Sequence, residues 1–106
     1  MVRSRTHAPT FAALGDETRL WLMAKLSAGR PCSIAQLTAG SRLTRQAITK
    51  HLRVMANAGI VHGVRRGREN LFALDPLPLE QAKGYLDVVS RKWDDALARL
   101  KSFVEE

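Results

Sequence analysis

The chain has 106 residues, of which 45% are apolar and 25% charged, and its formal net charge is +7. This length fits one domain with a modest core, and the composition is that of a folded globular protein rather than a disordered one. No apolar run approaches the ~20 residues that cross a bilayer, and residues 1–10 lack the apolar stretch of a secretory signal, so no membrane partner is predicted.

The first third of the chain predicts a polar tail followed by two helices. Residues 1–7 form the predicted tail, and the spacing of Ala8, Phe11 and Leu14 predicts a first helix that ends at Gly15. Asp16 is the expected N-cap of a second helix, because its carboxylate can accept from the free amides of the first turn. The predicted buried side chains of that helix are Leu22, Met23 and Leu26.

The middle of the chain predicts two further helices separated by a tight turn at residues 39–41. Ser33 is the expected N-cap of the shorter one, which would bury Ile34 and Leu37. Thr44 is the expected N-cap of the longer one, and Gly59 would end it in the left-handed conformation. Apolar side chains at steps of four and three predict its inner face: Ile48, Leu52 and Met55. Long polar side chains share the opposite face: Arg45, Gln46, Thr49, Lys50 and Arg53.

The last part of the chain predicts a β-hairpin and a long helix. Residues 60–64 and 70–74 are predicted strands, and residues 65–69 between them form a basic tip. Residues 75–78 contain two prolines and are expected to interrupt the pattern before the final helix. Three heptads of apolar side chains predict a seam that packs lengthwise on another helix: Ala82, Leu86, Val89, Trp93, Ala96, Leu100 and Phe103.

These elements predict a mainly α fold with a small β-hairpin, arranged as a winged helix-turn-helix. The window from Thr18 to Arg68 holds ten basic residues and no acidic one, whereas the other 55 positions sum to −3. Such a segregated charge attracts polyanions, so double-stranded DNA is the predicted partner. Base contacts are expected from Arg45, Gln46, Thr49 and Lys50. Phosphate contacts are expected from Ser41, Arg42, Thr44 and Arg53. The remaining predicted DNA-binding residues lie on the hairpin and are expected to clamp the DNA backbone or to enter the minor groove: Arg65, Arg66 and Arg68.

Several segments resemble the ArsR/SmtB family of winged-helix repressors. The resemblance spans residues 8–75 and is carried by residues 11–20, by TRQAITKHLRVM at 44–55, by NAGIV at 57–61 and by RRGR at 65–68. It implies a cytoplasmic bacterial repressor that binds a palindromic operator as a homodimer. The dimer would be held by the first helix, with Phe11, and by the last. A single domain is thus expected, with a DNA-binding head at 8–75 and a dimerisation helix at 76–106.

The chain departs from this family at the metal sites. Metal-sensing members place a Cys-x-Cys pair on the third helix around the position of Ile34, where this chain has Ser33 and Ala35, and Cys32 lies one position away. Other members use histidine and acidic residues of the last helix, but residues 76–106 contain no histidine. We therefore expect no metal and no cofactor, and the sequence identifies no inducer. A single cysteine also excludes an intramolecular disulfide, and we expect it to be an inert small residue.

Other classes of function fit the sequence less well. A protein-interaction module, such as an antitoxin or an anti-factor, could use the basic face on an acidic partner. An RNA-binding winged helix is less favoured, because no aromatic side chain lies on the basic face to stack on bases. An enzyme is not predicted, because no acid lies near His51 or His62 in the sequence and no glycine-rich phosphate loop is present.

Overall fold

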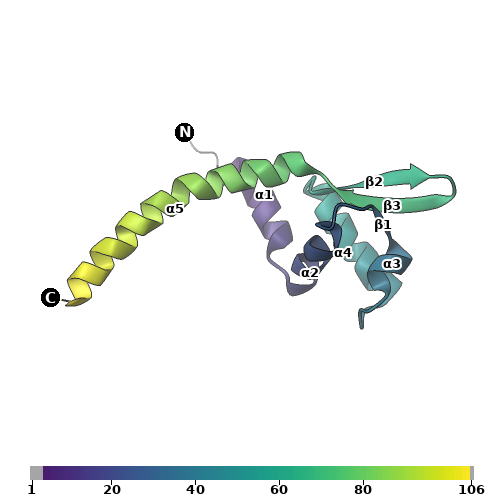
Figure 1. Cartoon of the computed structure of the whole chain (residues 1–106), viewed down its shortest axis with the longest axis horizontal. Coiled ribbons are helices and arrows are strands. Elements are labelled where there is room, and N and C mark those ends of the chain that lie inside the picture. Colours follow the sequence, from purple (N-terminus) through teal and green to yellow (C-terminus); the bar gives the residue numbers. More distant parts are fainter. Residues whose placement is uncertain (1–3, 106) are drawn as a thin grey trace.

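The computed structural model describes residues 4–105, in which five helices pack with a three-stranded antiparallel sheet (Figure 1). The mainly helical architecture confirms the predicted fold class. The elements follow in the order α1 (Ser4–Leu14), α2 (Glu17–Leu26), β1 (Cys32–Ser33), α3 (Ile34–Thr38), α4 (Arg45–Asn57), β2 (Val61–Arg66), β3 (Glu69–Leu74) and α5 (Pro76–Glu105).

The three predicted N-caps are confirmed. The side chains of Asp16, Ser33 and Thr44 each accept a hydrogen bond from the backbone amide three residues later, at 3.0, 3.1 and 3.1 Å. The Gln36 side chain also accepts from the backbone amide of Ser33 at 2.8 Å, which completes a capping box that we had not predicted. Each cap satisfies amides that have no partner inside the helix, so the starts of α2, α3 and α4 are fixed locally.

The end of α4 is fixed by Gly59, as predicted. Its φ is +80°, in the left-handed region where a side chain is strained. The Gly59 amide donates to the Ala56 carbonyl at 2.9 Å, and the Ile60 amide donates to the Met55 carbonyl at 3.0 Å. This pair of bonds is a Schellman motif, and it turns the chain directly from α4 into β2.

The sheet is larger than the predicted hairpin. Its strand order is β1-β3-β2, and β1 pairs Cys32 with Phe72. A strand of two residues has no periodicity to detect, so β1 was missed. Both hairpin strands are also longer than predicted, because Arg66 pairs with Glu69 and only two residues remain in the turn. Gly67 begins that turn with a φ of +63°, which a type II′ hairpin turn requires at its first central position.

Two helix boundaries differ from the prediction. α1 begins at Ser4, inside the predicted tail of residues 1–7, because a helix start without apolar residues leaves no periodic signal. α5 begins at Pro76, so both prolines of residues 75–78 lie in its first turn and do not precede the helix. Amides in a first turn have no partner within the helix, so proline is tolerated there. Asp75 accepts from the Leu77 amide at 3.1 Å and caps this start.

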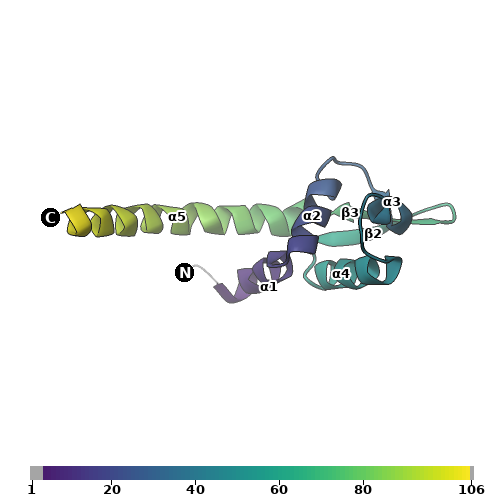
Figure 2. The same ribbon diagram turned by 90° about the horizontal axis from the view of Figure 1, so that it is seen from below.

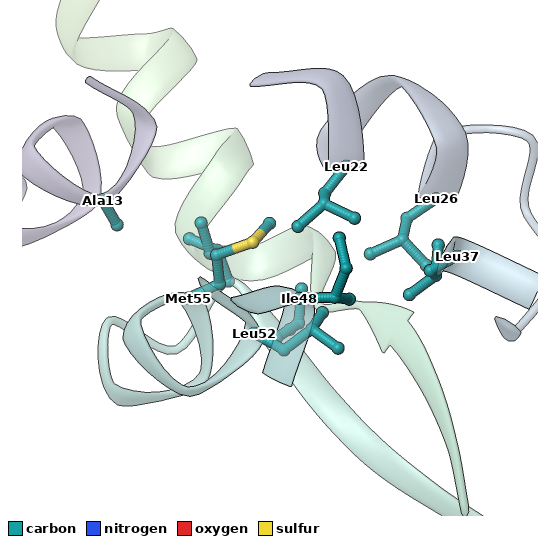
Figure 3. Close-up of a cluster of buried hydrophobic side chains, with 9 residues drawn as sticks. Ala13, Leu22, Leu26, Leu37, Ile48, Leu52 and Met55 are labelled. Atoms are coloured by element: carbon teal, nitrogen blue, oxygen red, sulfur yellow. The ribbon is translucent and has the colours of Figure 1, made fainter. Parts of the chain in front are cut away.

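One cluster of buried side chains joins the helices of the head. Leu22 and Leu26 of α2 and Leu37 of α3 point toward the inner face of α4 (Figure 3). The predicted inner residues of α4 are confirmed, since each is at most 1% exposed. The complete cluster is Ala13, Leu22, Leu26, Leu37, Ile48, Leu52, Met55, Ile60 and Val61.

α5 extends away from this head, whereas the β2–β3 hairpin projects from the opposite end (Figures 1 and 2). The overall dimensions are 63 × 31 × 21 Å, and the radius of gyration is 17.5 Å. A compact domain of this length would have a radius of gyration of about 13 Å. Much of α5 therefore lacks a packing partner among residues 4–105.

The inner face of α4 should dominate stability. Leu52→Ala is expected to lower the free energy of unfolding by about 2–5 kcal/mol, because the site is 1% exposed and the lost methyl groups leave a cavity. Val54→Ala on the same helix, 41% exposed, should cost less than about 0.5 kcal/mol. Urea denaturation followed by circular dichroism measures both, and equal losses would contradict the assignment of the inner face.

Candidate nucleic-acid interface

The outer face of α4 brings together the five polar residues that the sequence placed on it. They line one shallow hollow: Arg45, Gln46, Thr49, Lys50 and Arg53. All but Thr49 are exposed, and Thr49 is half-exposed. Because the inner face is buried in the core, this donor-rich face is directed to solvent. A helix of this width fits the major groove of B-DNA, where long donors reach base edges.

Thr49 is more constrained than the other members of this face. Its hydroxyl donates to the Arg45 carbonyl at 2.7 Å. The hydroxyl hydrogen is therefore committed to the helix backbone, and toward a ligand Thr49 offers only its oxygen lone pairs and its methyl group. Such a group can accept from a base amino group or contact a thymine methyl.

The turn before α4 holds three of the predicted phosphate contacts. The Ser41 hydroxyl oxygen accepts from the Leu43 amide at 3.0 Å, and the Thr44 hydroxyl accepts as the N-cap of α4. Both hydroxyls keep their own hydrogen for donation to an anion. Arg42 is exposed beside them, but it lines a second hollow with Ser41 and Trp21 of α2 rather than the hollow on α4.

The basic residues of the hairpin occupy different positions from those expected. Arg65 and Arg66 lie on β2 rather than in a loop, so their side chains point to opposite faces of the ribbon. Only Arg68 lies in the turn, next to Gly67. Glu69 is the register partner of Arg66, so the tip of the hairpin also carries one acid. All three arginines are exposed.

The predicted dimer residues fall into two groups. Phe11 is half-buried, and its ring lies 5.8 Å from that of Tyr85 on α5 of the same chain. On α5, Ala82 is buried in the head and Val89 is half-buried. The remaining residues of the predicted seam are exposed: Leu86, Trp93, Ala96, Leu100 and Phe103. Sequence periodicity missed two exposed apolar residues next to this seam, Leu97 and Val104. Val88 is also exposed, but no seam residue lies three or four positions from it, so it is on another side of the helix.

Within residues 4–105, no group of three or more His, Cys, Asp or Glu side chains is placed to hold a metal ion. Cys32 is half-buried in β1, and its thiol donates to the Arg30 carbonyl at 3.4 Å. No helix of the described part is long and apolar enough to cross a membrane.

One carboxyl next to α4 has a shifted pKa. The pKa of Asp16 is lowered from 3.8, chiefly because its carboxylate accepts a hydrogen bond from the Arg19 amide; the positive charge of Arg19 acts in the same direction. The cap is therefore strongest when Asp16 is ionised.

The arrangement of α3, turn, α4 and the β2–β3 hairpin defines a winged helix-turn-helix. Comparison with known proteins identifies the family. Residues 16–62 match the family model of the bacterial regulatory proteins of the arsR family. The chain is 34% identical over 84 residues to an uncharacterised HTH-type transcriptional regulator of Bacillus subtilis strain 168, YuzN, covering 73% of this chain and 91% of that protein.

A second relative is the HTH-type transcriptional regulator Rv2034 of Mycobacterium tuberculosis, with 29% identity over 88% of this chain and 83% of that protein. Among solved structures, an ArsR-like transcriptional regulator from Rhodococcus sp. RHA1 has 32% identity and a TM-score of 0.79, covering 96% of this chain and 93% of that one. This chain belongs to the ArsR family and is a DNA-binding transcriptional regulator rather than an enzyme. Nothing in these comparisons supports the alternative of a protein-interaction module.

The lowered pKa of Asp16 predicts a pH-dependent contribution to stability. A lowered folded-state pKa means that the stabilisation is present above the unfolded value, near pH 4, and is lost as the pH falls through the folded value. Asp16→Asn should therefore be less stable than wild type at pH 6 and equal to it in strong acid. Thermal denaturation from pH 6 to pH 2 measures this difference.

Asp94→Asn on the exposed part of α5 is the control for loss of one negative charge. A difference in melting temperature between Asp16→Asn and wild type that stays constant from pH 6 to pH 2 would contradict the assignment of Asp16 as a cap that stabilises in its ionised form.

Proposed function

We propose that this regulator is a cytoplasmic bacterial repressor that binds a palindromic operator as a homodimer. The observation that carries the proposal is the hollow on α4, which five polar side chains line without any acid. When the protein is bound through α4 to an operator next to a promoter, it would block access of the transcription machinery to the same DNA.

In this proposal α4 enters the major groove. Arg45, Gln46, Thr49 and Lys50 contact bases or lie beside them, and Arg53 contacts a phosphate. Arg and Lys favour guanine O6 and N7, and Gln favours adenine N6 and N7, so the reading face has preferences for both purines. Because the Thr49 hydroxyl already donates its hydrogen to the Arg45 carbonyl, Thr49 can only accept from a base amino group or contact a thymine methyl.

The turn before α4 and the wing supply the remaining contacts. Ser41, Arg42 and Thr44 bind a phosphate next to the N-terminus of α4, where free amides also favour an anion. Arg65, Arg66 and Arg68 clamp the DNA backbone or enter the minor groove. Because Arg65 and Arg66 face opposite sides of β2, they contact different groups.

A stripe of exposed apolar side chains along α5 supports the proposed dimer. Trp93 is 56% exposed, Leu100 58% and Phe103 74%, although each is a large apolar side chain that burial would stabilise. A second copy of α5 would cover this stripe. Two heads joined in this way would place their α4 helices in successive major grooves, about 34 Å apart on one face of the duplex.

Replacement of Gln46 tests the proposed reading face. Gln46→Ala should reduce the preference for DNA from the protein's own promoter over shuffled DNA by ~1–3 kcal/mol, because one base contact is lost. Gln81→Ala, an exposed glutamine on α5, is the matched control. Fluorescence anisotropy with both DNAs over a range of salt concentrations provides the measurement.

For wild type, binding to the promoter DNA should be saturable and salt-sensitive. An unchanged preference in Gln46→Ala would remove Gln46 from base reading. Equal binding of wild type to promoter and shuffled DNA would overturn the proposed function.

A charge placed in the stripe of α5 tests the dimer. Leu100→Glu should weaken dimerisation by at least about 2 kcal/mol, because the interface would bury an unpaired carboxylate. Ser102→Glu adds the same charge about 200° around the helix from Leu100 and should leave the dimer intact. Sedimentation equilibrium would detect a shift from twice the 11.8 kDa chain mass toward the single mass. A monomeric wild type, or equal effects of both variants, would contradict this interface.

A further inference from the structure

Arg19 of α2 lies where three helices meet, and it contacts all three. Its Nε donates to the carbonyl of Ala13 in the last turn of α1. Its Nη1 lies 3.2 Å from Nδ1 of His51 in the middle of α4. Its own backbone amide donates to Asp16, the N-cap of α2, at 3.0 Å. One side chain thus links α1 and α2 to the helix that carries the proposed reading face.

The chemistry of this contact defines the state of the histidine. A guanidinium can only donate, so Nδ1 of His51 accepts the hydrogen bond and the ring hydrogen lies on Nε2. Oδ2 of Asp16 is 3.7 Å from the same Nδ1. A protonated ring would carry a hydrogen on Nδ1, lose the bond from Arg19 and gain Asp16 as an acceptor. The observed contact therefore requires the neutral ring.

His51 lies on the inner side of α4, next to Leu52, and its side chain is 24% exposed. The apolar contacts of Leu52 and its neighbours are not directional, so they tolerate small rotations of α4 about its axis. A hydrogen bond to a fixed donor is directional and restricts that rotation. Base reading needs side chains held within about 0.5 Å and 10–20° of the productive geometry. The Arg19–His51 contact supplies such a restriction one residue away from Lys50.

We propose that Arg19 is a positioning residue for DNA reading, which fixes the rotation of α4 through His51. The inference rests on the proposed function, because it assigns Arg19 to the operator preference of that same reading face. Loss of the contact leaves the core in place but lets the outer face rotate, so operator binding weakens more than binding to unrelated DNA.

The test measures the ratio of affinities for own-promoter and shuffled DNA, together with the urea midpoint, in a set of full-length variants. Arg19→Met removes the donor, and Lys25→Met removes the same charge from an exposed site on α2. His51→Leu removes the acceptor. His51→Asn keeps an acceptor on Cγ, where histidine carries Nδ1.

Arg19→Met and His51→Leu should each lower the ratio about tenfold, the effect of one lost base contact, and the double variant should be no worse than either. Lys25→Met and His51→Asn should keep it. The two His51 variants retain Arg19, so their comparison still tests the inference if Arg19→Met fails to fold.

A lower urea midpoint with an unchanged ratio in Arg19→Met would show a merely structural role and overturn the inference. Equal ratios for wild type and His51→Leu would overturn it too. A wild-type ratio of one would overturn the proposed function and this inference with it, whereas a wild-type preference that Arg19→Met retains would overturn the inference alone.

Discussion

Burial of the inner face of α4 is the constraint on which the rest of the structure depends. Ile48, Leu52 and Met55 have almost no exposed surface, and they face Leu22 and Leu26 of α2. With 3.6 residues per turn, burial of these positions directs the residues between them outward. Those outward residues include no acid, so the face opposite the core is a continuous set of hydrogen-bond donors and long polar side chains. Core packing and DNA binding are thus two consequences of one helical pattern.

Contacts at the ends of α4 place the neighbouring elements. Thr44 fixes its first turn, and the Schellman motif at Gly59 sends the chain straight into β2. Because the hairpin starts at the last turn of α4, the wing is held at a defined position relative to the reading face. α5 continues from the other strand of the hairpin in the opposite direction, so its uncovered apolar stripe lies away from the wing. The charge pattern follows the same division, with ten of the 17 basic residues in the head and the wing and six of the ten acids in residues 76–106.

Most interactions that fix the helix ends join residues three to five positions apart and could be predicted from the sequence, although the contribution of Gln36 to the capping box at Ser33 was not. The caps at Asp16, Ser33 and Thr44 and the stop at Gly59 act within single turns, so local patterns were enough. The same holds for the inner and outer faces of α4, which follow from helical periodicity. Family membership agrees with these predictions, whereas the individual DNA and dimer contacts remain proposals.

Features that depend on distant parts of the chain could not be predicted. β1 exists only because residues 32–33 find β3 some 40 positions later. The contact between Arg19 and His51 joins residues 32 positions apart, and neither carries a local signal for it. The start of α5 was misplaced because prolines usually interrupt helices, although they are tolerated in a first turn. The heptad pattern also underestimated the apolar face of α5, because Leu97 and Val104 lie just outside the strict repeat.

Methylation interference on DNA from the protein's own promoter tests the central claim most directly. Dimethyl sulfate methylates guanine at N7 in the major groove and adenine at N3 in the minor groove. If paired α4 helices read the major groove, guanine methylation should block binding in two clusters whose centres lie about 10 base pairs apart. Interference from adenine N3 alone, or from guanines without this paired spacing, would contradict recognition by two α4 helices in successive major grooves.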